Sequence, residues 1–223
     1  VGVTKYCNYP PQAKNKTKVG DFTISTEAVL NLKPDLIVAH SKLNSSAITS
    51  LEHLHLNVFS IDPTSISQTY KSILQLGKIT DTSKKAQKIV SNMQSKISHI
   101  KNIQASKKSR SVLFVIQAHP LWVAGPKTIP NEMLHILNAK NIASDSRPGF
   151  MSFSEELSVS RNPDTIIVGT KSDANYFRKS KIWNKTTAVK QNRVIIVNPD
   201  ILVRPGPRLI NGLNELSKYL SHN

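Results

Sequence analysis

The longest periodic segment of the chain spans residues 84–104. Apolar residues recur in it at helical spacing, at Ala86, Ile89, Val90, Met93, Ile97 and Ile100. Residues three and four positions apart share one face of a helix, so the pattern predicts a single amphipathic helix with lysines and serines on its other face. At about 1.5 Å per residue this helix would be about 30 Å long. We expect it to organise the fold.

Short apolar runs and helical segments alternate along the rest of the chain. Strands are predicted at residues 1–4, 36–39, 58–61, 112–116, 165–169 and 193–197. Helices are predicted at residues 25–32, 47–54, 131–137, 174–188 and 209–220. Strands of continuous apolar composition are typical of parallel sheets that are buried on both faces. The chain is therefore predicted to have an α/β fold.

One pattern occurs twice. The stretch from Glu27 through LNLKPDLIVAHSK matches the stretch from Glu156 through SVSRNPDTIIVGTKS, and LNVFSIDPTS matches NRVIIVNPDI. Each copy has a capped helix, a Pro-Asp break, a strand, a helix and a second strand. The repeat predicts two Rossmann-like parallel-sheet lobes joined by the long helix, with a ligand cleft between them. We assign residues 1–65 to the N-terminal lobe, 66–108 to a linker region with the long helix, and 109–223 to the C-terminal lobe.

The two copies begin at different points. The second copy has a strand at 112–116 and a helix at 131–137 before its extended segment at 141–143, whereas the first copy begins at the equivalent of that last segment. We therefore expect the first strand and helix of the N-terminal lobe, roughly 20 residues, to lie upstream of Val1. A leader peptide would lie further upstream, so its absence here says nothing about the compartment.

Composition narrows the possible functions. The 223 residues include 30 Lys+Arg and 14 Asp+Glu, a net charge of +16. The lysines are dispersed, without interleaved aromatics or a nucleic-acid-binding motif, so we interpret them as a solvated surface and expect no nucleic-acid partner. A strongly acidic ligand or partner is compatible with this charge. No apolar run reaches 18 residues, and the single cysteine, Cys7, excludes an internal disulfide.

The chain lacks the motifs of common catalytic sites. No GxSxG, HExxH, P-loop or GxGxxG pattern occurs. His40 and His119 follow predicted strands and are candidate metal or ligand contacts, although a structural role is more common for a lone histidine. Cys7 has no neighbouring base that would activate it as a nucleophile. We predict a binding protein rather than an enzyme, with no cofactor and no metal site.

The loops that follow the predicted strands are rich in aromatic residues. These loops span residues 5–22, 40–45, 118–130 and 198–208, with 144–153 beside them, and carry Tyr6, Tyr9, Phe22, Trp122, Phe150 and Phe153. Loops at the carboxyl ends of parallel strands form ligand sites, and such a set suits a large, flat, partly apolar ligand. The alternative is that some of these rings cap the cores. Asp200 and Arg204 would bind a polar ligand edge or form a salt bridge within their loop.

Several segments resemble a known family. KYCNYPPQAK, LNLKPDLIVAHSKLN, SRPGFMSFSEEL, NPDTIIVG and RPGPRLINGL resemble class III (helical-backbone) periplasmic substrate-binding proteins, which serve ABC importers of cobalamin and iron chelates. The Tyr-x-x-Tyr-Pro-Pro and Asp-x-x-x-Arg patterns most closely resemble the cobalamin (vitamin B12)-binding members. The resemblance implies a monomer in the periplasm or cell envelope that captures cobalamin or a related corrinoid and delivers it to a membrane permease dimer.

The resemblance also assigns roles to residues. It implies ligand contacts from Tyr6, Tyr9, Phe22, His40, Trp122, Phe150, Asp200 and Arg204. It implies permease docking by Glu27 and Glu156, whose equivalent places in the repeat support this role. The alternative for each glutamate is a helix-terminal carboxylate that the helix dipole stabilises by ~0.3–1 kcal/mol. The alternative ligand is haem or a ferric siderophore, with Tyr6, Tyr9, His40 or His119 binding iron.

Overall fold

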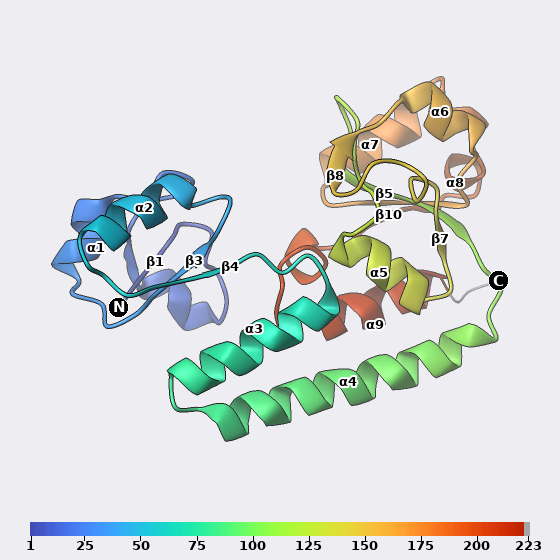
Figure 1. Cartoon of the computed structure of the whole chain (residues 1–223). Helices are drawn as coiled ribbons and strands as arrows, with labels where there is room; N and C mark the ends of the chain where they lie inside the picture. The colour runs from blue at the N-terminus through green and yellow to red at the C-terminus, as the bar shows by residue number, and fades with distance from the viewer. Residues whose placement is uncertain (221–223) are drawn as a thin grey trace. The chain divides into compact units, whose positions relative to one another are not determined.

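The computed structural model describes residues 1–220 of the chain (Figure 1). Its contacts divide the chain into two compact units, Val1–Asp62 (unit 1) and Pro63–Asn223 (unit 2). Both units contain parallel strands and helices, so the predicted α/β class is confirmed.

Unit 1 contains two separate pairs of parallel strands. Its elements are β1 (Gly2–Val3), η1 (Pro11–Asn15), β2 (Thr17–Lys18), α1 (Thr26–Asn31), β3 (Ile37–His40), α2 (Ser45–His53) and β4 (Val58–Ile61). Within the described part of the chain, β1 pairs only with β2, and β3 pairs only with β4. The buried core of this unit is small and centres on Val19, Val29 and Leu51.

Unit 2 begins with two antiparallel helices, α3 (Ile66–Ile79) and α4 (Ser83–Ala105) (Figure 1). The predicted long helix is therefore confirmed as α4. Gly77 allows the two helices to approach closely, because a Cβ atom there would collide with Ala86. On α4, Ile100 joins the core of unit 2. Residues 66–108, which the sequence suggested as a separate linker region, thus fall within the second compact unit.

A six-stranded mixed sheet forms the centre of unit 2. Its strands are β5 (Ser111–Gln117), β6 (Trp122–Ala124), β7 (Lys140–Asn141), β8 (Phe150–Ser152), β9 (Thr165–Val168) and β10 (Val194–Ile196). Strand β5 lies between β7 and β9 and is parallel to both, and β10 continues the parallel part. Strands β6 and β8 extend the sheet in antiparallel orientation.

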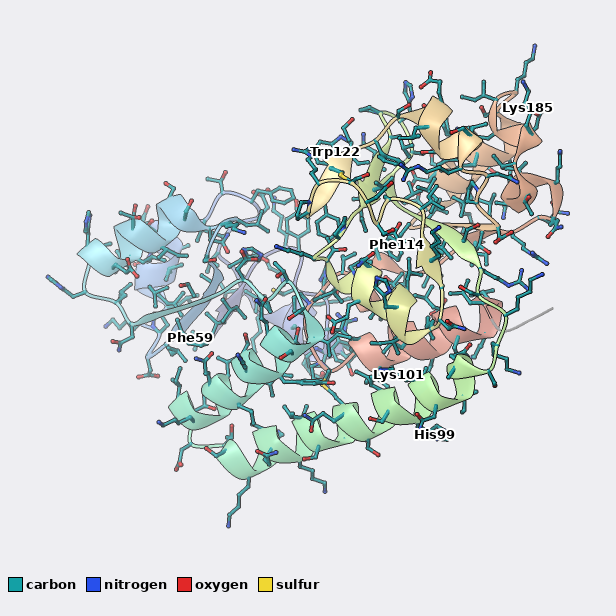
Figure 2. All side chains as sticks on the ribbon, turned by 45° about the vertical axis from the view of Figure 1, so that its right-hand side comes forward. Phe59, His99, Lys101, Phe114, Trp122 and Lys185 are labelled. Carbon is teal, nitrogen blue, oxygen red and sulfur yellow. The ribbon has the colours of Figure 1, made fainter. Side chains whose placement is uncertain are left out.

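Alternating residues of β5 fill two cores on opposite faces of this sheet. Val112 and Phe114 belong to the core formed with α4, α5 and α9, whereas Leu113 and Val115 belong to the core that contains Phe177 and Trp183. Figure 2 shows Phe114 inside the unit and Lys185 projecting away from it. The remaining helices are α5 (Ile129–Ile136), α6 (Glu155–Ser160), α7 (Lys171–Lys179), η2 (Trp183–Lys185), α8 (Thr187–Lys190), η3 (Pro199–Ile201) and α9 (Leu209–Leu220).

The structure corrects two local predictions. The segments 118–130 and 144–153, expected to be loops, contain β6 and β8, whose three-residue length leaves too little pattern to detect. The helix predicted for 174–188 ends at Lys179 and resumes only in short turns. Beyond the end of α7, the buried Trp183 ring packs edge-on against Phe177, with 4.6 Å between centroids.

The internal repeat has a counterpart in the backbone. Ile37 pairs with Val58 in unit 1 as Ile166 pairs with Val194 in unit 2. The residues that precede the two equivalent prolines, Lys33 and Asn162, both have positive φ, at 44° and 43°. The central strand β5 breaks this correspondence, because the described part of unit 1 contains no equivalent strand.

Candidate functional site

The predicted aromatic residues of unit 1 lie on the loops around β1 and β2. Tyr6, Tyr9 and Phe22 are all exposed, and Phe22 is 72% exposed. The Tyr6 and Phe22 rings contact each other, with 4.7 Å between their centroids. Large aromatic side chains that gather at the surface are typical of binding sites, because they bury much apolar area when a ligand covers them. We refer to these three residues as the Tyr6 group.

The loop that carries Phe22 is anchored to the segment that carries Tyr6. The Lys5 backbone N–H donates to the Gly20 carbonyl at 3.0 Å, and Lys5 Nζ contacts Asp21 Oδ2 at 3.1 Å. Hydrogen bonds from the Thr23 N–H and from Lys5 hold the pKa of Asp21 below its usual value. The carboxylate therefore stays charged, and the loop connection persists at neutral pH.

His40 is held by contacts within unit 1. Its Nδ1 accepts from the backbone N–H groups of Lys42 and Leu43, both at 3.3 Å, and its Nε2 lies 3.2 Å from Asp62 Oδ1. Both ring nitrogens are therefore engaged, which favours a structural role for this histidine. The predicted ligand contact for His40 would have to displace one of these interactions.

The predicted aromatic residues of unit 2 lie on neighbouring antiparallel strands. Trp122 on β6 is opposite Ser152 on β8, and Phe150 is two residues from Ser152 on the same face. Both rings are exposed, Trp122 at 39%, whereas Val123 and Met151 between them point into the core. Diagonal neighbours across strands are about 7–8 Å apart, within reach of one flat ligand. Phe153 differs, since it is half-buried with the Arg161 guanidinium 5.5 Å from its ring centroid.

Asp200 and Arg204 form the ion pair that their spacing allows. Arg204 Nη2 lies 2.9 Å from Asp200 Oδ1, and the Asp200 carboxylate is the more buried partner. The backbone N–H of Asp200 donates to Asn198 Oδ1 at 2.9 Å, which fixes the start of η3. The pair thus presents a guanidinium held in one orientation at a partly exposed position.

Glu27 and Glu156 occupy equivalent places on short capped helices. Ser25 accepts from the N–H of Ala28 on α1, and Ser154 accepts from the N–H of Leu157 on α6, each at 3.1 Å. Each glutamate lies two residues after its capping serine and is exposed. A backbone N–H and the Ser154 hydroxyl, which donates to Glu156 at 2.8 Å, lower the pKa of the Glu156 carboxyl. Glu156 is therefore ionised at neutral pH.

A polar cluster next to Glu156 was not expected from the sequence. The Glu155 carboxylate, 17% exposed, accepts from the Tyr176 hydroxyl at 2.7 Å and from Trp183 Nε1 at 2.8 Å. Burial and the nearby Glu155 raise the pKa of Tyr176 to about 12. His119 Nδ1 lies 3.3 Å from the Tyr176 hydroxyl and 3.6 Å from Glu155. The cluster ties the first turn of α6, which carries Glu156, to α7 and η2.

No sequence signal pointed to this cluster. The partners of Glu155 lie 21 and 28 positions away, in a lysine-rich stretch that gave only a helical pattern. The one usable hint was the capping serine, which places a glutamate in the first turn but does not identify what it binds.

The described residues offer no obvious metal centre. Residues 1–220 hold no group of three or more His, Cys, Asp or Glu side chains that converge as metal ligands would. Cys7 Sγ lies 3.4 Å from Thr4 Oγ1.

No helix in the described residues 1–220 is both long and apolar enough to cross a membrane.

The net positive charge is concentrated in unit 2. Residues 63–223 contain 24 of the 30 Lys+Arg and 9 of the 14 Asp+Glu, whereas the two charge types nearly balance in residues 1–62. A ligand or partner that approaches unit 2 therefore meets most of the positive electrostatic field, which favours an anionic ligand or partner there.

Sequence comparisons place the chain in a family. The model of the periplasmic binding protein family matches residues 1–201. An uncharacterized ABC transporter substrate-binding lipoprotein of Bacillus subtilis is 37% identical over 99% of this chain and 72% of its own length. The vitamin B12-binding protein of Salmonella paratyphi A is 29% identical over 99% of this chain and 82% of its own length.

Solved structures agree with this assignment. A possible iron-binding (periplasmic solute-binding) protein of Staphylococcus epidermidis has a TM-score of 0.86 and 32% identity, covering 100% of this chain and 90% of its own. The periplasmic haem-binding protein of Vibrio cholerae has a TM-score of 0.86 at 23% identity, over 100% and 90% of the two chains, and shares the fold. The chain therefore belongs to the periplasmic binding protein family and is the substrate-binding component of an ABC transporter, a solute receptor and not an enzyme.

Proposed function

We propose that the ligand of this receptor is cobalamin or a related corrinoid, which it delivers to the membrane permease of its importer. The observation that carries the proposal is the set of exposed aromatic rings, the Tyr6 group in unit 1 and the pair Trp122 and Phe150 in unit 2. A corrin is a broad, mostly apolar plate. Stacked or edge-on aromatic contacts contribute about 0.5–1.5 kcal/mol each beyond the area that they bury.

The polar pair Asp200 and Arg204 suits the edge of such a plate. The side-chain amides of a corrinoid need both donors and acceptors. The Arg204 guanidinium can donate and the Asp200 carboxylate can accept, and the two groups lie 2.9 Å apart. The vitamin B12-binding protein of Salmonella, similar over 99% of this chain, supports the same ligand class.

We propose in addition that Glu27 and Glu156 dock the receptor onto cationic side chains of the permease. Both carboxylates are exposed and occupy the same position of a serine-capped helix in the two copies of the repeat. Two matched carboxylates suit the two subunits of a permease dimer. Exposed ion pairs act mainly on orientation and association rate, so docking should weaken as salt rises.

Fluorescence titration with cyanocobalamin tests the ligand. The chain has two tryptophans, the exposed Trp122 and the fully buried Trp183, so quenching by bound ligand should come mainly from Trp122. We expect saturable quenching at micromolar ligand that is largely lost in Trp122→Phe. Ligand at about 100 times Kd should add about 2.7 kcal/mol to the stability of the folded state, which raises the melting temperature. A flat titration of the wild-type protein would contradict the proposal.

The second candidate ligand is haem or a ferric siderophore. The similar protein from Staphylococcus epidermidis is described as possibly iron-binding, and the positive charge of unit 2 favours an anionic chelate. Tyr6, Tyr9 and His119 are the candidate iron ligands in this case. A Soret band on adding haemin, lost in Tyr9→Phe or His119→Ala, would favour this ligand over a corrinoid.

A further inference from the structure

The two docking glutamates have equivalent positions but different surroundings. On α6, the Ser154 hydroxyl donates to Glu156 Oε2 at 2.8 Å. On α1, the equivalent Ser25 caps the helix, and within residues 1–220 no hydrogen bond or ion pair reaches the Glu27 carboxylate. A bonded side chain is held in one orientation, whereas an exposed glutamate without a partner keeps its rotamer freedom. Glu156 is therefore the more ordered of the two carboxylates in the free protein.

The residue before each glutamate differs as well. In unit 2 it is Glu155, whose partly buried carboxylate accepts from the Tyr176 hydroxyl at 2.7 Å and from Trp183 Nε1 at 2.8 Å. Trp183 is fully buried, so these bonds fasten the first turn of α6 to the core of unit 2. In unit 1 the equivalent residue is Thr26, whose hydroxyl makes no hydrogen bond to the described residues. The first turn of α1 thus lacks a fastening of this kind.

The chemistry of the Glu155 fastening points to orientation. A partly buried charge is a poor device for stability alone, because apolar side chains of similar volume often stabilise a core as well. Hydrogen bonds differ from apolar packing in being directional. Two bonds from different elements fix the rotation of the first turn of α6, and Glu156 is the next residue along this turn. They therefore fix the direction in which the Glu156 side chain leaves the helix.

We propose that Glu156 is a pre-oriented docking carboxylate that makes the larger contribution to permease binding, that Glu155 is its positioning residue, and that Glu27 becomes ordered only on contact with the permease. The inference rests on the proposed docking role of the two glutamates. A side chain that must be ordered at an interface lowers the affinity, whereas one that is ordered beforehand does not. The repeat thus supplies two carboxylates that are equivalent in position and unequal in effect.

Binding to permease-containing vesicles measures the inequality. Glu156→Gln should weaken binding about two- to tenfold more than Glu27→Gln, because the contribution of Glu27 is reduced by the ordering of its side chain. Both substitutions remove one charge from an exposed first-turn position, so each is the matched control of the other.

A double-mutant cycle tests whether the Glu155 fastening acts through Glu156. Tyr176→Phe removes one bond to Glu155. It should weaken vesicle binding of the wild type and of Glu27→Gln at least about twofold, but should have no further effect in Glu156→Gln. A merely structural role would weaken all three proteins alike. Tyr219→Phe, at an exposed position on α9, is the matched control and should leave binding unchanged.

A measurement without the permease follows the orientation of Glu156 itself. Its own backbone N–H and the Ser154 hydroxyl lower the pKa of the Glu156 carboxyl in the folded protein. If Tyr176→Phe loosens the first turn of α6, these donors are partly lost and the pKa of Glu156 should rise toward its usual value. Carboxyl carbon NMR during a pH titration measures this pKa in the wild type, Tyr176→Phe and Tyr219→Phe.

A pair of serine variants gives a second test that leaves the Glu155 cluster intact. Ser25→Ala and Ser154→Ala each remove a helix cap, but only Ser154→Ala also removes a bond to a docking carboxylate. Ser154→Ala should therefore weaken vesicle binding more than Ser25→Ala.

The outcomes separate this inference from the docking role on which it rests. Equal losses in Glu27→Gln and Glu156→Gln, or an effect of Tyr176→Phe that persists in Glu156→Gln, would overturn the inference and leave the docking role intact. An unchanged pKa of Glu156 in Tyr176→Phe, or equal binding by the two serine variants, would likewise overturn it. Normal vesicle binding by both glutamine variants would overturn the docking role and this inference together.

Discussion

The polar cluster around Glu155 gives a quantitative prediction for Tyr176→Phe. The substitution removes the hydroxyl that lies 2.7 Å from the Glu155 carboxylate and keeps the ring that stacks on His119. Hydrogen bonds to charged groups contribute about 1.5–3 kcal/mol, and Glu155 retains its bond from Trp183 Nε1. We therefore expect a loss of about 1.5–3 kcal/mol in the free energy of unfolding of unit 2.

The stability of the wild-type protein should also depend on pH in a way that the stability of Tyr176→Phe does not. The pKa of Tyr176 is raised from its usual 10.0 to about 12, mainly by burial and then by Glu155. A group whose pKa is raised on folding stabilises the protein fully below its unfolded pKa and loses this contribution as pH rises through its folded pKa. The contribution of Tyr176 should therefore be present below pH 10 and decline between about pH 10 and 12.

Urea unfolding of both proteins at several pH values between 8 and 11.5 measures the two effects. The difference between the urea midpoints of the wild type and Tyr176→Phe should be largest near pH 8 and become smaller as the pH approaches 11.5. Tyr219→Phe, at an exposed position on α9, is the matched control and should change stability by less than about 0.5 kcal/mol. Equal midpoints for wild type and Tyr176→Phe at pH 8 would refute the argument that the cluster stabilises unit 2.

Two further predictions concern docking and the unequal cores. Glu27→Gln and Glu156→Gln should leave ligand affinity unchanged and weaken binding to permease-containing vesicles in a salt-dependent way. Glu52→Gln on α2 is the control and should change neither ligand affinity nor vesicle binding. Normal vesicle binding by both docking variants would contradict the docking role of Glu27 and Glu156. In chemical unfolding, Ile167→Ala should cost about 2–5 kcal/mol, because its side chain is 1% exposed, whereas Val38→Ala should cost less than about 1 kcal/mol, because Val38 is 48% exposed. Similar costs for the two substitutions would contradict this difference in burial.

The sequence predicted those parts of the fold that many residues encode together. The helix α4 spans 23 residues, and apolar residues recur in it at helical spacing from Ala86 to Ile100, so its extent was predicted to within one residue at each end. The parallel strands β3, β4, β9 and β10 were predicted because each lies in a short, mostly apolar run of residues. Strands β6 and β8 were missed because three residues cannot establish an alternation, and only the pairing of β6 with β5 and of β8 with β6 defines them.

The candidate site likewise has features that the sequence predicted and features that it did not predict. The equivalent places of Glu27 and Glu156 were predicted because the repeat and the capping serines are local features. The cluster of Glu155, Tyr176 and Trp183 was not predicted, because tertiary packing brings together side chains 21 and 28 positions apart. The engagement of both nitrogens of His40 with its own loop and Asp62 likewise depends on backbone geometry that no residue pattern specifies.

Isothermal titration calorimetry with cyanocobalamin tests the central claim most directly. The account predicts saturable binding of one corrinoid per chain at micromolar or lower Kd, with affinity reduced at least about tenfold by Trp122→Ala, since an interfacial aromatic anchor contributes more than 1.4 kcal/mol. Parallel titration with haemin distinguishes the second candidate ligand. Absence of binding heat with cyanocobalamin, together with a Soret band and saturable binding with haemin, would contradict the assignment of a corrinoid.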